Sequence, residues 1–248
     1  MTILTFKELS FELRESPRRR TVEIAIERDG SLVLVTPPHV PQDELERIVE
    51  QRRFWIYSKL IKKESYKAPT GTKTYLPGEG FYYLGRSYRL RLVDNAKTPL
   101  QLYQSRFELL RSALLPRGDA KGERRSASLS QQHRGQEHFI QWYRTHLPPH
   151  LEATINPLVN RIGASPRSLQ VRELVYRWGS CSPQGGLYFH WRVAMLPRSM
   201  IEYIVVHELV HLIEPHHNRA FWDRVARILP DFDKRKHWLA ENGAIYTL

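Results

Sequence analysis

The first part of the chain alternates apolar and polar positions with a period of two, which is typical of β-strands. Val22, Ile24 and Ile26 alternate with polar or small residues, and the apolar residues 32–35 follow an Asp-Gly turn signal. This pattern predicts a β-hairpin. Between residues 81 and 110, the stretches FYYL, SYRLRLV, LQLY and RFELL predict further short strands. No internal sequence repeat is apparent.

Other parts of the chain follow the helical period of 3.6. Apolar residues fall on one face of residues 42–63, which predicts an amphipathic helix. Helical periodicity resumes near residue 136, and Pro148 and Pro149 are expected to break this region into two helices. The stretch 116–135 is poor in large apolar residues and strongly basic, so it is predicted to be a mobile insertion or linker.

Towards the C-terminus, LQVRELVYRW and GLYFHWRVAML predict two strands joined by a turn rich in Gly and Pro. On the second strand, Tyr188, His190 and Arg192 alternate with large apolar residues, so one face is expected to be core and the other open. The elements together predict the α+β class. The pattern predicts three parts: an N-terminal β-rich part with a helix (1–115), a flexible basic insertion or linker (116–135) and a C-terminal part (136–248).

A helix with unusual chemistry is predicted in the C-terminal part. Ser199 and Glu202 stand at the spacing of a capping box, so this helix is expected to start at 199–200. It should stop at Glu214, because Pro215 disfavours helical geometry at the residue before it. The helix carries His-Glu-x-x-His within an otherwise apolar segment, where unpaired polar groups are costly.

This motif has the spacing of a metal site. His207 and His211 lie on one helix face, about 6 Å apart along the axis, where they can share one cation. Glu208 lies about 100° around the axis, within reach of a metal-bound water without being a ligand. His217 follows the proline break and precedes Asn218, a suitable cap for a second helix, so it is the expected third ligand. Three imidazoles and a water make an open, catalytic zinc site.

The sequence alone leaves alternatives open for the metal ligands and for Cys181. His216 competes as the third ligand, followed by Asp223 and Glu241, and the helix histidines could instead form hydrogen bonds in the core. Cys181 could be a thiolate ligand or nucleophile, but its place in a Gly-Ser turn favours a small packed residue. Its neighbour Trp178 is expected to shape the wall of a cleft.

The motifs resemble those of a known family. They are Arg-Trp-Gly-Ser-Cys at 177–181, a Trp-Arg pair at 191–192, the His-Glu-x-x-His helix at 207–211, and His-x-x-x-Phe-Trp at 217–222. In this combination the chain resembles the YgjP-like metallopeptidase family, which is related to the SprT-like and WLM domains. The basic stretch and hairpin at 18–35 resemble its N-terminal part. Two departures are His190, where the family commonly has Asn, and the 116–135 stretch.

The resemblance implies a zincin-like catalytic part and leaves three function classes open. The first is a zinc metallopeptidase, with Glu208 as general base and the edge of strand 187–195 holding an extended polypeptide. The second is a nucleoside triphosphate pyrophosphatase that uses this metal or Mn²⁺ or Mg²⁺, with Arg177 or Arg192 binding phosphate. The third is a nucleic-acid-associated module with a structural metal. We expect Arg177, Trp178 and Arg192 to contact the substrate.

The composition gives only limited information on the partners and the cellular compartment of the protein. The 248 residues carry a formal net charge of +12, which makes nucleic acid or another anionic partner plausible, although the basic residues are spread over the whole chain. A single cysteine and the absence of a signal-like apolar segment indicate a reducing cytoplasm. The longest apolar run is too short and too often interrupted to cross a membrane.

Overall fold

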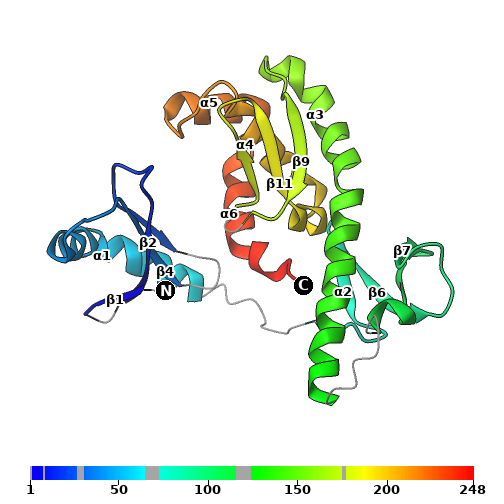
Figure 1. Cartoon of the computed structure of the whole chain (residues 1–248). Coiled ribbons are helices and arrows are strands. Elements are labelled where there is room, and N and C mark those ends of the chain that lie inside the picture. The colour runs from blue at the N-terminus through cyan, green and yellow to red at the C-terminus, as the bar shows by residue number, and fades with distance from the viewer. Residues whose placement is uncertain (1, 8, 27–30, 65–72, 116–123, 175–176) are drawn as a thin grey trace. The chain divides into compact units, whose positions relative to one another are not determined.

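The chain folds into two compact units, residues 1–69 and 70–248. The computed structural model describes residues 2–7, 9–26, 31–64, 73–115, 124–174 and 177–248 (Figure 1). Helices and strands are mixed throughout, which confirms the α+β class. The compact units divide at residue 69, whereas the sequence pattern placed a boundary at 115. The strands between residues 80 and 110 share a hydrophobic cluster with the C-terminal elements, and this connection could not be seen in the local pattern.

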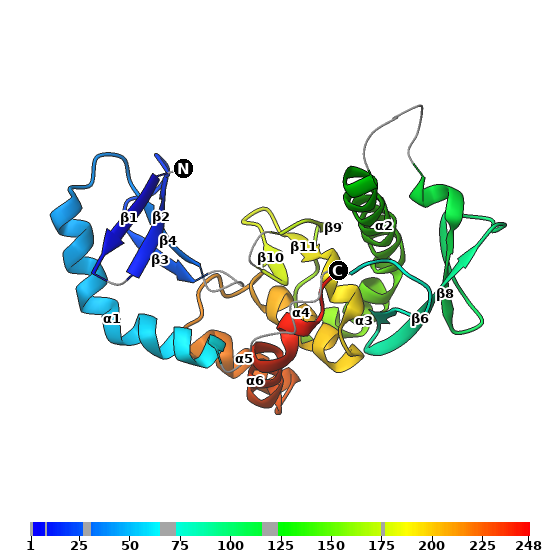
Figure 2. The ribbon, with the colours of Figure 1, turned by 90° about the horizontal axis from the view of Figure 1, so that it is seen from below.

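Unit 1 is a four-stranded sheet packed on one helix (Figure 2). Its elements are β1 (Thr2–Phe6), β2 (Leu9–Glu15), β3 (Glu23–Ile26), β4 (Leu32–Thr36) and α1 (Gln42–Glu64). The strand order is β1-β2-β4-β3; β2 and β4 run parallel, and the outer pairs are antiparallel. The antiparallel β3–β4 pair confirms the hairpin, although its turn lies outside the described residues. Phe11, Leu34 and Ile56 are fully buried where the sheet meets α1.

Unit 2 begins with a second module of the same topology. Its elements are β5 (Gly80–Tyr83), β6 (Arg86–Val93), β7 (Leu100–Tyr103), β8 (Arg106–Leu110), the 3-10 turn η1 (Arg111–Leu114) and α2 (Arg124–His146). The order is β5-β6-β8-β7, again with a parallel central pair and antiparallel outer pairs. The chain therefore contains the same four-strand-and-helix arrangement twice. The sequence pattern missed this repeat, because its visible trace is only LSFELR in β2 against RSYRLR in β6.

Helix α2 begins at Arg124, so residues 124–135 are helical and are not the linker that the sequence predicted. Their helical state follows from the apolar half of α2, where Phe139 stacks on Phe81 with ring centroids 4.0 Å apart. A helix fixed at one end extends easily into polar sequence, because only nucleation is costly. Residues 116–123 lie outside the described residues. The break at Pro148 is confirmed: α3 spans Pro148–Ile162.

The remaining elements build the C-terminal half of unit 2. They are β9 (Ser168–Arg172), β10 (Gly179–Cys181), β11 (Gly186–His190), η2 (Trp191–Met195), α4 (Arg198–Val210), α5 (Arg219–Ile228), α6 (Phe232–Asn242) and η3 (Gly243–Ile245). The sheet order is β10-β11-β9, with β11 antiparallel to β10 and parallel to β9. β11 is therefore the central strand.

The predicted strand 187–195 is only partly correct. It ends at His190, and residues 191–195 form η2, because the Nδ1 atom of His190 accepts a hydrogen bond from the backbone N–H of Arg192. His190 is 1% exposed, so it does not lie on an open face as expected. Predicting alternation through this stretch failed because a polar side chain capped a turn inside it.

The segment before α4 is anchored by the β5–β6 hairpin. The backbone N–H groups of Leu84 and Gly85 donate to the carbonyls of Ala194 and Met195. Gly85 has φ +82°, and a Cβ there would lie 2.8 Å from the Cα of Pro197, so only glycine allows this approach. The second module thus fixes where α4 starts.

Helix α4 starts directly after Pro197 without a side-chain cap. The predicted capping box of Ser199 and Glu202 is therefore absent, because Glu202 instead accepts a hydrogen bond from Arg235 at 2.6 Å. Within the described part of the chain, none of the helices combines the length and apolar character that a membrane span requires.

Candidate metal centre

Helix α4 carries His207, and its C-cap residue is His211. Val206, Leu209 and Val210 are fully buried, which fixes the orientation of the helix and leaves His207 and His211 directed to one side. The helix ends at Val210, earlier than the predicted stop at Glu214, although the Glu214 N–H still bonds to the Val210 carbonyl.

The loop after α4 brings the third histidine, His217, close to the other two. Asn218 is the N-cap of α5, and its side chain accepts a hydrogen bond from the Phe221 N–H at 2.9 Å, as the sequence predicted. His217 directly precedes this cap. The Nε2 atom of His217 lies 2.9 Å from that of His207 and 3.0 Å from that of His211.

The three imidazoles form a donor set that could hold a metal ion. Their nitrogens all lie within 4.8 Å of one another. Tetrahedral zinc with bonds of roughly 2.0–2.1 Å separates its ligand nitrogens by about 3.3 Å, so the observed spacing needs only a slight opening. Among the described residues this group comprises His207, His211 and His217, and His216 is not part of it. Neither are Asp223 and Glu241.

The protonation states also suit metal binding. Burial, together with the neighbouring imidazoles, lowers the pKa of His207 to about 3. Burial likewise lowers the pKa values of His211 and His217. Nδ1 of His211 lies 3.0 Å from the Glu214 carbonyl, so it carries the proton and leaves Nε2 with a free lone pair. Neutral imidazoles with free lone pairs are the form that binds a cation.

An aromatic wall encloses the imidazoles. The ring of Phe221 lies 4.5–4.9 Å from all three histidine rings, and Trp222 stacks on His217 at 5.6 Å. Phe232 of α6 stacks on the ring of Trp222. This packing restricts the rotation of His217, which comes from a loop and has no helix to orient it.

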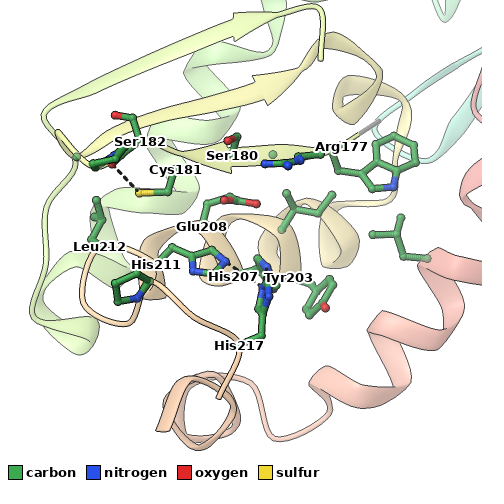
Figure 3. A pocket seen from close by; sticks show the side chains of 17 residues that line it. Arg177, Ser180, Cys181, Ser182, Tyr203, His207, Glu208, His211, Leu212 and His217 are labelled. Atoms are coloured by element: carbon green, nitrogen blue, oxygen red, sulfur yellow. Dashed lines mark hydrogen bonds between the residues drawn. The ribbon is translucent and has the colours of Figure 1, made fainter. Parts of the chain in front are cut away.

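Glu208 lies beside this group and close to the edge strand β10. It is 6% exposed, and a Cβ added to Gly179 would lie 2.7 Å from its Cγ and Oε1 atoms. In Figure 3 its carboxylate lies between Ser180 of β10 and the imidazoles. Burial raises the pKa of Glu208 to about 8, against the opposing effect of Arg177. A carboxylate whose pKa is near neutrality can both take and return a proton.

A cavity of about 890 Å³ opens over the three histidines and Glu208. Arg177 and Trp178 line it, together with Tyr203 of α4, and their expected contact with a substrate stays a prediction. Arg192 does not line this cavity, so its predicted contact with substrate is not supported: its guanidinium lies over the Trp191 ring at 5.3 Å.

Cys181 also lines the cavity, at the end of β10. Its thiol donates a hydrogen bond to the Ser182 carbonyl, and burial together with the nearby Glu208 raises its pKa. A raised pKa keeps the sulfur protonated, which disfavours the nucleophile or ligand role that the sequence left open.

A hydrogen-bonded network around the partly exposed Glu173 side chain was not found from the sequence. The Glu173 carboxylate accepts hydrogen bonds from the Trp191 indole and from Nε2 of His190, which lies at 2.8 Å. His190 in turn caps η2, the segment that leads into α4. The available signal was His190 itself, a titratable residue in an apolar strand, which should have prompted a search for its partner.

A comparison with models of protein families identifies the family of the chain. The family model of the YgjP-like metallopeptidase domain matches residues 20–242. The chain therefore belongs to the YgjP-like metallopeptidase family, a family of metal-dependent hydrolases that act on polypeptides. Among solved structures, the crystal structure of the metallopeptidase zymogen of Pyrococcus abyssi abylysin is similar at 22% identity, with a TM-score of 0.33, over 37% of this chain and 97% of that chain. No curated protein matches the chain.

Proposed function

We propose that this YgjP-like metallopeptidase domain hydrolyses peptide bonds with zinc held by His207, His211 and His217 and with Glu208 as the general base. The observation that carries the proposal is the convergence of three neutral imidazole nitrogens beside one buried carboxylate. Such a set leaves a coordination position open, as catalytic zinc sites do.

Zinc fits the donor set better than the alternatives Mn²⁺ and Mg²⁺. All three donors are imidazole nitrogens, whereas Mg²⁺ prefers oxygen ligands and keeps several of its waters. When bound, zinc lowers the pKa of its water to about 7 and polarises a substrate carbonyl.

Glu208 supplies the proton transfer in this proposal. Its carboxylate takes a proton from the attacking water and passes it to the leaving amine. Burial supports this role, because it raises the pKa of Glu208, and the ionised form of such a carboxyl is a stronger base than an exposed glutamate. We propose that Arg177 contacts the substrate, because it lines the same cavity and its charge lowers the pKa of Glu208.

The substrate is proposed to bind at the edge of β10. The sequence favoured the strand at 187–195 for this purpose, but β11 is paired on both sides and has no free edge. β10 is paired only with β11 among the described residues, and it lines the cavity. An extended polypeptide that adds to β10 would place its backbone beside Glu208.

The nucleotide alternative is weaker. Of the two arginines predicted to bind phosphate, only Arg177 lines the cavity. The nitrogen-only donor set also disfavours the Mg²⁺ that phosphoanhydride chemistry commonly uses.

The test is Glu208→Gln, which preserves the volume of the side chain. We expect the variant to keep its zinc, because Glu208 is not a ligand, and to lose about 10²–10⁴-fold in the hydrolysis of unfolded polypeptides. Zinc content, melting temperature and rate are measured on the same preparation, with nucleoside triphosphates as the parallel substrate. Unchanged turnover would remove Glu208 from the mechanism, and a module with a merely structural metal would hydrolyse neither substrate.

A further inference from the structure

Each of the two repeated modules contains a groove at the same place. In unit 1 a cavity of about 580 Å³ lies between the edge strand β3 and α1. In unit 2 a cavity of about 510 Å³ lies between the edge strand β7 and α2. In both, the third strand of the module and the helix after the fourth strand form the walls. A groove between an unpaired strand and a helix suits an extended peptide, which can extend the sheet and direct alternate side chains at the helix.

The β3–α1 groove has an apolar floor and basic sides. Its apolar side chains are Val22, Ile24, Pro37, Val40 and Ile48. Arg20 and Arg52 border it, and among the described residues neither forms an ion pair. One carboxylate, Glu44, also lines the groove. The two cations therefore exceed the single anion.

The β3 strand can provide backbone hydrogen bonds. It pairs antiparallel with β4 on one side, and on the other side it has no strand partner among the described residues. Alternate residues of such a strand direct N–H and C=O groups outward. Ile24 is opposite Leu34, a core residue, so its side chain lies on the face that α1 covers and contributes to the groove floor.

The equivalent groove of unit 2 differs in its chemistry. Gln101, Gln141, Thr145 and two histidines line it, and it has no arginine or lysine. His146 stacks on Trp142 with ring centroids 4.0 Å apart, which fills part of its floor. The shared topology gives both modules a groove, but only the first groove combines an apolar floor with unpaired cations.

We propose that the β3–α1 groove of unit 1 is a docking site for an extended polypeptide that alternates apolar and acidic residues. The peptide adds to the edge of β3 as a further strand, its apolar side chains enter the groove towards Ile48, and its acidic side chains pair with Arg20 and Arg52. This site lies outside the metal centre. It rests on the proposed function only in that the bound polypeptide would be a substrate.

The proposal is tested with the full chain carrying Glu208→Gln, so that no probe is cleaved. The probe is a short fluorescein-labelled peptide that alternates valine and glutamate, and its binding is followed by fluorescence anisotropy. We expect Arg20→Glu together with Arg52→Glu to weaken binding at least about tenfold. The matched control is Arg18→Glu together with Arg47→Glu, the same charge change at two exposed positions of unit 1 that do not line the groove, and it should bind like the parent.

Two further probes test the charge pairing and the backbone hydrogen bonds of the bound peptide separately. A peptide with lysine in place of glutamate should bind the parent weakly and the doubly substituted chain better, which a folding defect could not produce. A valine-glutamate peptide with N-methyl groups on alternate residues keeps its side chains but loses backbone donors, so one of its two methylation patterns should abolish binding.

Other results would overturn the proposal. Equal binding to the parent and the doubly substituted chain would exclude the groove, and dimerisation lost on Arg52→Glu without peptide binding would make a second copy of the chain the occupant. Displacement of the probe by a single-stranded oligonucleotide at low concentration would favour nucleic acid. Binding is measured without hydrolysis, so these outcomes can be interpreted even if the protein proves to have no peptidase activity. Peptidase activity without binding in the groove would refute the docking site and leave the proposed function intact.

Discussion

Gly179 determines how closely the edge strand β10 approaches Glu208. A side chain at this position would overlap the Glu208 carboxylate, since the first added carbon would already lie 2.7 Å from Oε1. The glycine in the Arg-Trp-Gly-Ser-Cys motif is thus explained by the space that the carboxylate needs.

Gly179→Ala is therefore expected to displace Glu208 without disturbing the imidazoles. Hydrolysis should fall at least about tenfold, since small displacements of a general base are costly, while the zinc content should remain that of the parent. Adding Gly179→Ala to Glu208→Gln should cause little further loss in rate, because both changes act on the same group. Loss of zinc in Gly179→Ala, or fully additive losses, would contradict this explanation.

Glu173 offers a test through pH. Burial opposes its ionisation, but the Trp191 indole and the His190 imidazole hold the pKa of the carboxyl below its ordinary value. A depressed carboxyl pKa adds stability that is present above the unfolded pKa, about 4.3, and is lost as the pH falls through the folded pKa. The melting temperature of the parent should fall below about pH 4.3, and that of Glu173→Gln should depend less on pH in this range. Parallel curves for the two proteins would exclude the contribution.

The residues differ in how far sequence could identify them. His207, Glu208 and His211 are spaced along one helix, so their mutual geometry follows from the helix period alone. Glu173 and His190 are 17 residues apart and meet only through the pairing of β9 with β11. Local periodicity carries no information on such a contact, which is why the network was missed.

At the level of elements, the loop between α4 and α5 completes the metal centre. The Arg224 side chain of α5 pairs with Glu214 at 3.2 Å, and the Asn218 cap fixes the first turn of α5. The His211 imidazole bonds to the Glu214 carbonyl within the same loop. The loop thus holds His217 and orients His211 at once.

His217→Ala should weaken zinc binding far more than His216→Ala, because only His217 belongs to the three-imidazole group. Both residues are exposed and adjacent, so a general disturbance of the loop should affect the two variants equally. Zinc affinity is measured by competition with a chromogenic chelator. A greater loss in His216→Ala would move the third ligand to that position.

The elements also show where sequence patterns were sufficient. The α1 helix, the helix break at Pro148 and the Asn218 cap were predicted, because each depends on a local signal. The capping box at Ser199 failed, since the helix begins at Arg198 and Glu202 accepts a hydrogen bond from Arg235, 33 residues away. The strand β10 was missed, because the Gly and Pro residues of 179–185 predicted only a turn between two strands.

At the scale of the molecule, the two units have separate cores. The buried cluster of unit 1 extends from Phe6 to Ile56, and that of unit 2 extends from Tyr75 to Tyr246. Every side chain of the candidate metal centre belongs to unit 2, as does the module that anchors the start of α4. Unit 2 therefore contains all that the proposed chemistry requires, whereas the basic groove belongs to unit 1 alone.

We expect residues 70–248 expressed alone to fold, because all described residues of their hydrophobic cluster belong to unit 2. The truncated chain should bind about one zinc and hydrolyse a short peptide at a rate close to that of the full chain. If the groove of unit 1 captures extended substrates, hydrolysis of a long acidic polypeptide by the truncated chain should fall at least about tenfold in kcat/KM at the same time.

Circular dichroism and thermal unfolding establish that the fragment is folded. The ratio of the rates on the long and the short substrate is then compared with that of the full chain carrying Arg20→Glu and Arg52→Glu. A folded fragment without zinc would show that unit 1 supports the metal centre, and an unchanged ratio would show that it does not select substrates.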